Sequence, residues 1–193
     1  MATREQLAQE NRRNLERVTV LTLREARQLL AKGDGLNQQE LGGFLRTLIP
    51  GIVQRYGNVN AVLAMNYYDT VRDLFAQSTK PYKAYIPELD PYQEVDSIVG
   101  YGMAHFQEKG FTGIPDIIAN ALTRPVANWN RDTMRTNAVA DPARTVIQRV
   151  ARSGACAFCA MAALNSTKVI EGRTTVMSAR DRKSTRLNSS HRT

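Results

Sequence analysis

Cys156 and Cys159 are the residues whose types and spacing point most directly to a chemical function. In a Cys-x-x-Cys turn the two thiolates can converge on one metal ion. A structural zinc site needs four ligands in a tetrahedral arrangement, and this pair supplies half of them. The pattern also suits a buried pair of small residues, or two thiols kept reduced in a cytosol. A thioredoxin-like redox pair is disfavoured, because no βαβ pattern surrounds the two cysteines.

Few other side chains in the sequence could complete such a site or perform catalysis. His105 lies between the apolar Met103 and Phe106, which favours a structural helix histidine over a base or a ligand. Acidic residues gather near the middle of the chain, where they favour an acidic loop and a first helical turn over a catalytic pair; they are Glu88, Asp90, Glu94 and Asp96. Phosphate loops, nucleophile elbows and His-Glu-x-x-His motifs are absent from the sequence.

Arginines are concentrated around Trp129 and in the segment that follows it. Such a basic group could bind DNA through phosphate contacts without reading bases, or could meet an acidic protein surface. A solvated helical face is the favoured alternative. The candidate residues for contact with nucleic acid or a partner are Arg124, Arg131, Arg135, Arg144, Arg149 and Arg152.

The balance of charge is mildly basic once the last residues are set aside. The 193-residue chain has a formal net charge of +8. Residues 181–193 contain four cations and one anion, so the net charge falls to +5 without them. Contact with nucleic acid or an acidic surface is therefore allowed but not required. No apolar run is long enough to span a bilayer, and the polar N-terminus is not typical of a secretory signal.

The segment from Asp181 to His191 resembles a translated sequencing adapter rather than a protein element. It has no apolar periodicity, and all eleven of its residues match one reading frame of a common short-read library adapter. We therefore expect residues 181–193 to be foreign to the fold, and we expect the reading frame to be incomplete at this end. On this interpretation His191 is not a functional histidine.

Apolar residues at intervals of three and four predict a mainly α-helical chain with several antiparallel helices. Pro50 is expected to kink or split one helix, Gly57 to close it, and Pro125 to kink another. Asp141-Pro142 is typical of an N-cap followed by proline in the first turn. Helices are expected over residues 3–32, 38–56, 59–77, 94–109, 115–139 and 142–150.

Prolines and tyrosines between residues 80 and 92 predict a loop or hinge between two helical parts. The expected organisation is an N-terminal helical region (1–79), this Pro/Tyr-rich loop (80–92), a second helical region (93–153), the start of a truncated Cys-x-x-Cys module (154–180) and the adapter-like tail (181–193).

Three short runs resemble the phage Mu head-morphogenesis (MuF-like) minor capsid proteins of tailed phages. They are Asp141-Pro142, Arg149-Val150, and the Cys-Ala-Phe-Cys-Ala-Met run at 156–161. In that family a long helical region precedes the cysteines, and a downstream His-containing segment ending in Cys-x-Cys completes the metal site. The resemblance implies that Cys156 and Cys159 are half of a zinc knuckle. Residues 162–165 depart from the usual leucine-alanine-serine-arginine of the family, which leaves the geometry after the knuckle open.

The resemblance implies a structural minor capsid or head-morphogenesis protein that acts near the portal or the inner shell. The expected partners are the phage portal and major capsid proteins, with packaged DNA as a further candidate and zinc as the only cofactor. Neither a membrane nor a small-molecule substrate is expected. The expected location is the virion head, and the host cytoplasm during assembly. Two alternatives are a metal-dependent nuclease or toxin-like enzyme whose catalytic part is missing, and a non-specific basic DNA-binding module.

Overall fold

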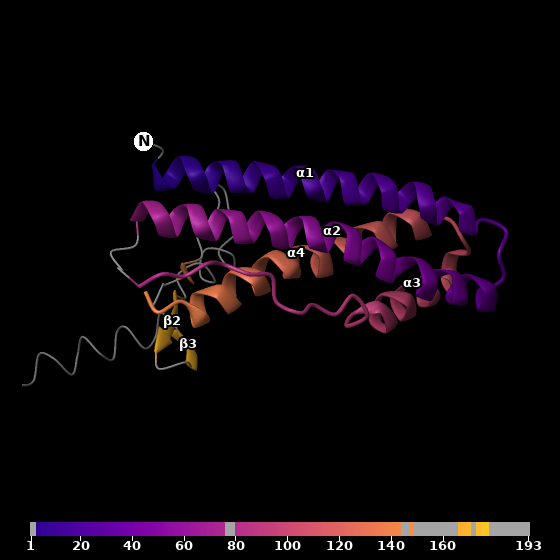
Figure 1. Ribbon diagram of the computed structural model, residues 1–193. Helices are drawn as coiled ribbons and strands as arrows, with labels where there is room; N and C mark the ends of the chain where they lie inside the picture. Colours follow the sequence, from indigo (N-terminus) through magenta and orange to yellow (C-terminus); the bar gives the residue numbers. More distant parts are fainter. Residues whose placement is uncertain (1–2, 76–79, 144–146, 149–165, 171–172, 178–193) are drawn as a thin grey trace, which may run out of the picture. The chain divides into compact units, whose positions relative to one another are not determined.

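The computed structural model describes residues 3–75, 80–143, 147–148, 166–170 and 173–177. Most of these residues are helical, which confirms the predicted mainly α class (Figure 1). The helices are α1 (Arg4–Leu30), a 3₁₀ turn η1 (Ala31–Gly33), α2 (Gln38–Phe75), α3 (Val95–Lys109) and α4 (Ile114–Ala140). In the described residues that follow, the strands are β1 (Ile147–Gln148), β2 (Ser166–Ile170) and β3 (Arg173–Met177).

The starts of α1 and α2 are set by reciprocal capping contacts. The Thr3 hydroxyl accepts from the Gln6 amide at 3.2 Å, and the Gln6 side chain accepts from the Thr3 amide at 2.8 Å. Asn37 and Glu40 form the same arrangement at 3.0 and 3.1 Å before α2. Between the two helices Gly35 has a φ of 84°, a conformation that favours glycine. The break expected between the helices over 3–32 and 38–56 is therefore confirmed.

Helix α2 is one continuous element, so the predicted division at Gly57 was wrong. The chain continues through Gly57 because this residue is buried against the indole of Trp129 from α4. Pro50 also lies inside α2 without splitting it. A proline removes one helix hydrogen bond. Ile49, before Pro50, and Val53, after it, are both buried in the core, so packing holds the helix on either side of the proline.

Helices α3 and α4 agree with the sequence pattern. Gly110, with a φ of 66°, ends α3 where expected. Pro115 lies in the first turn of α4, and Pro125 lies inside it without ending it. Residues 81–90 form neither helix nor strand, and Pro81 and Pro87 each remove a backbone donor there.

The helix predicted over 142–150 was wrong where the structure describes that segment. The Asp141 carboxylate accepts from the Ala143 amide at 2.8 Å, which forms an Asx turn and not the predicted start of a helix. Ile147 and Gln148 instead form β1, which pairs antiparallel with Thr167 and Ser166 of β2. Isoleucine suits a strand as readily as a helix, and pairing with a distant strand overrides the local pattern. Strands β2 and β3 form an antiparallel hairpin.

The chain forms two compact units, which are described separately. The first comprises Met1–Leu74 and Ala84–Met134, and the second comprises Phe75–Lys83 and Arg135–Thr193. Helices α1 to α4 all contribute fully buried apolar side chains to the core of the first unit, among them Leu30, Leu45, Ile49, Val99, Ile118 and Leu122. In the second unit, the Tyr82 hydroxyl donates to the buried Asn137 side chain at 2.7 Å.

Candidate partner interface on helix α4

Helix α4 exposes two of the predicted contact arginines on the first unit. Arg124 and Arg131 are seven residues apart, so they share one face of the helix. Arg124 lies 3.8 Å from the Glu94 carboxylate, with its own side chain 77% exposed. Arg131 is exposed and forms no ion pair within the described residues. A pair as exposed as that of Arg124 is weak, so both guanidiniums can bind an external anion.

The other predicted contact residues are distributed differently. Arg135 belongs to the second unit, where it is exposed. The remaining residues fall outside the part of the chain that the structure describes, and these are Arg144, Arg149, Arg152 and the two candidate zinc ligands, Cys156 and Cys159.

Trp129 does not lie at the surface among these arginines. Its side chain is 6% exposed and packs against Gly57 of α2. The indole therefore contributes to the core of the first unit. It cannot stack on a ligand beside Arg124 or Arg131, because its face is covered.

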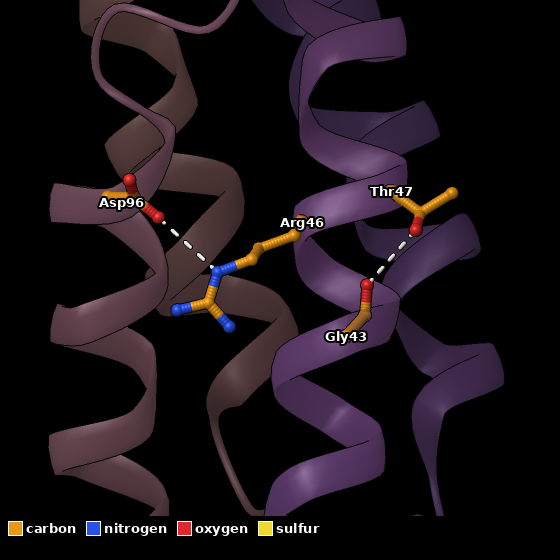
Figure 2. Close-up of polar contacts among 4 residues, drawn as sticks. All are labelled: Gly43, Arg46, Thr47 and Asp96. Atoms are coloured by element: carbon orange, nitrogen blue, oxygen red, sulfur yellow. Dashed lines mark hydrogen bonds and ion pairs between the residues drawn. The ribbon is translucent and has the colours of Figure 1, made fainter.

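The acidic residues near the start of α3 make local structural contacts. The Asp90 carboxylate accepts from the Tyr92 amide at 2.8 Å. Glu94 accepts from the Asn128 side chain at 3.0 Å, which links the start of α3 to α4. Figure 2 shows Arg46 of α2 reaching Asp96 of α3, at 3.3 Å between Nε and Oδ1, beside the intrahelical bond of Thr47. These contacts favour the structural interpretation over a catalytic pair.

His105 also has a structural contact. Its Nε2 atom lies 3.3 Å from the carbonyl oxygen of Thr112, at the turn between α3 and α4. A carbonyl oxygen only accepts, so this ring nitrogen is the donor. Within the described residues, no three His, Cys, Asp or Glu side chains are grouped so that they could hold a metal ion.

A polar cluster between α1 and α2 was not predicted from the sequence. Glu25 of α1 accepts hydrogen bonds from the Arg55 guanidinium and from the Tyr56 hydroxyl of α2. Burial raises the pKa of Tyr56 to about 12, and the hydrogen bond and negative charge of Glu25 act in the same direction. The nearby charge of Arg55 partly opposes this rise.

The raised pKa of Tyr56 has a consequence for stability at high pH. The folded state retains the phenol proton that the unfolded chain loses near pH 10. The contribution is therefore complete below about pH 10 and is lost as the pH rises toward about 12. Between about pH 10 and pH 12, we expect the free energy of unfolding of Tyr56→Phe, measured by urea titration, to fall less steeply with pH than that of the parent protein. Equal slopes for the parent and Tyr56→Phe would contradict this, and Tyr101→Phe, at an exposed tyrosine of α3, is the control.

A second polar contact, between α2 and α4, was also missed. The side-chain amide of Asn60 donates to the backbone carbonyl of Val126 at 2.9 Å. The side-chain amide of Asn130 donates to the backbone carbonyl of Asn60 at 3.2 Å. Both asparagines are buried. An asparagine on the apolar side of a helix was the available signal, but its partner lies 66 residues away.

No helix in the described segments combines the length and apolar character needed to cross a membrane.

Comparison with known proteins identifies the family of the chain. No curated protein and no solved structure matches the chain. A family model described as VG15 protein matches residues 1–168, a range that contains α1 to α4 and both cysteines. The chain therefore belongs to the VG15 protein family, a phage-associated family of viral proteins.

Proposed function

We propose that this chain is a structural minor capsid protein of a tailed phage, related to the MuF-like head-morphogenesis proteins. It acts without catalysis in head assembly, near the portal or the inner shell, and is retained in the virion head. Membership in a phage-associated family supports a role in a phage. The Cys-Ala-Phe-Cys-Ala-Met run at 156–161 supports the MuF-like relationship.

The exposed arginine face of α4 is the observation that carries this proposal. Val126 and Trp129 fix the inner side of the helix in the core, and Arg131 projects from its outer side. A helix that is already ordered loses little conformational entropy when it binds. Arginine also forms planar, two-pronged hydrogen bonds to carboxylates. The face therefore suits an acidic surface of the portal or capsid protein.

Packaged DNA is the second candidate for this face. A phosphate would bind the same guanidinium groups, without base recognition. The two partners differ in their response to salt, because DNA binding releases condensed counterions and weakens steeply as salt rises. Retained binding to the portal protein at a salt concentration that abolishes DNA binding would favour the protein partner.

Reversing the charge of Arg131 tests the proposed interface. We expect Arg131→Glu to weaken binding to the portal protein of the same phage by on the order of tenfold, because attraction to a carboxylate becomes repulsion. Biolayer interferometry at fixed salt is a suitable measurement. Lys109→Glu makes the same charge change at an exposed position of α3 and should have little effect. An equal loss of affinity for the two variants would contradict a specific interface on α4, because binding would then depend only on the net charge of the chain.

A zinc knuckle is the proposed role of Cys156 and Cys159, which would hold the ion through their thiolates as half of its ligand set. Bound zinc would cross-link the chain around these cysteines. Cobalt should produce a thiolate charge-transfer band that Cys156→Ser abolishes. An unchanged band in that variant would exclude the assignment.

A further inference from the structure

Helix α1 has an outward face that differs in character from the face it packs into the core. Val18, Thr22, Ala26 and Leu30 are buried. On the opposite side, five residues at helical spacing form what we call the α1 stripe, and these are Arg13, Arg17, Val20, Leu21 and Arg24. Val20 is 64% exposed and Leu21 is 52% exposed, although both are apolar. Along the helix axis the two apolar residues therefore lie between Arg17 and Arg24, and as adjacent residues they point about 100° apart, to the two sides of the row of arginines.

The three arginines of the stripe form no ion pairs within the described residues. Two other charges of the same helix are engaged elsewhere, whereas the exposed Glu10 and Glu16 lie three residues before and three residues after Arg13. Arg27 pairs with Asp116 of α4 at 2.6 Å, and Glu25 binds Arg55 and Tyr56 of α2. Three arginines against these two glutamates leave this part of α1 with a net positive charge, and its solvent exposure lets an acidic partner approach.

A second copy of this chain fits the stripe poorly. In an antiparallel pairing that covers Val20 with the Leu21 of another copy, Arg17 would face Arg24. In a parallel pairing in register, each arginine would face itself. Like charges directly across an interface are destabilising, so both arrangements are disfavoured.

Nucleic acid also fits the stripe poorly. Phosphates would satisfy the arginines, but the sugar-phosphate backbone offers no apolar group to cover Val20 and Leu21. A protein helix with apolar residues at its centre and carboxylates one turn to either side would satisfy both needs. Amphipathic helices commonly bind a partner through side chains at such i, i+3, i+4 and i+7 positions.

We propose that the α1 stripe is a docking surface for an acidic amphipathic helix of a partner protein. The apolar pair supplies the desolvated centre of the contact, and the arginines select a partner of opposite charge. This inference uses residues of α1 alone and does not depend on the proposed role of α4. Failure of either proposal therefore leaves the other standing.

A designed peptide provides the test. The probe is a fluorescent helical peptide of about 20 residues, long enough to hold several turns. It has two central leucines and a glutamate one turn before and one turn after them. Its control has the same composition in scrambled order. We expect fluorescence anisotropy to show binding of the designed peptide at least about tenfold tighter than of the scrambled one.

Variants of α1 assign the binding to the stripe. Arg17→Glu and the double variant Val20→Ser with Leu21→Ser should each weaken peptide binding by about tenfold or more. Arg12→Glu is the matched control, because it reverses one exposed charge on the same helix outside the stripe. All of these side chains are exposed, so thermal melts of the variants should be unchanged.

Three results would overturn the proposal. The first is equal binding of the designed and scrambled peptides. The second is an equal loss of binding for Arg12→Glu and Arg17→Glu. The third is that the stripe variants instead abolish duplex DNA binding or self-association, measured by anisotropy and by sedimentation.

Discussion

Replacing Gly57 by alanine should lower the melting temperature of the helical unit, although alanine normally stabilises a helix. A Cβ atom at Gly57 would lie 2.4 Å from Cδ2 and 2.7 Å from Cε3 of Trp129. Trp129 is only 6% exposed, so its indole has little room to move away. Overpacking of this kind costs about 1–3 kcal/mol. That exceeds the roughly 0.5–1 kcal/mol that alanine gains over glycine in a helix, and a fall of several degrees should follow.

The controls for this variant lie in the same two helices. A Cβ at Gly51 of α2 meets nothing within 4 Å, so Gly51→Ala should raise the melting temperature slightly. Combining Gly57→Ala with Trp129→Leu should cost less than the sum of the two single changes, because the smaller side chain relieves the overlap. If Gly57→Ala and Gly51→Ala gave equal melting temperatures, the close packing of α2 on α4 would be refuted.

Replacing Asn60 by aspartate should destabilise the same contact in a pH-dependent manner. The Oδ1 atom of Asn60 is buried and accepts no hydrogen bond within the described residues. A carboxylate there would place negative charge in a site without a donor. When protonated, the new carboxyl group could still donate to the Val126 carbonyl, as the Asn60 amide does. The folded state should therefore hold this proton well above pH 4.

The direction of the pH effect follows from that retained proton. Above about pH 4 the unfolded chain releases it and the folded chain keeps it, so stability falls as the pH rises. The loss is about 1.4 kcal/mol per pH unit until the folded state also ionises, or up to about 4 kcal/mol by pH 7. Urea titrations of Asn60→Asp at several pH values would measure it. Asn58→Asp, at an exposed position of α2, should show no comparable loss, and equal curves would contradict the buried contact.

Local sequence signals predicted most of the helical framework. Apolar spacing predicted helices that begin near residues 3 and 38, and the local caps at Thr3 and Asn37 agree with those starts. Gly110 ends α3 because its positive φ favours glycine. Such signals involve neighbouring residues only, which is why the sequence shows them.

The errors came from residues whose structure depends on distant partners. Gly57 was expected to end a helix, but it accommodates an indole that is 72 residues further along the chain. Ile147 was expected in a helix, but it pairs with Thr167 in a sheet. A local pattern cannot distinguish a glycine that ends a helix from one that makes room for a side chain.

The candidate interface was predictable in part. The concentration of arginines around Trp129 pointed to Arg124 and Arg131, which lie on an exposed face of α4. The sequence could not show that Trp129 is buried beneath them. The sequence also did not indicate the contact of Glu25 with Tyr56. A glutamate and a tyrosine on two different helices give no local signal that they face each other.

Mass spectrometry of purified particles of the encoding phage, including procapsids, tests the proposed head role most directly. We expect peptides from α1 to α4 in procapsids and in tail-free heads, at far lower abundance than the major capsid protein. Peptides found only in the infected-cell lysate, and absent from procapsids and heads, would contradict a minor capsid role.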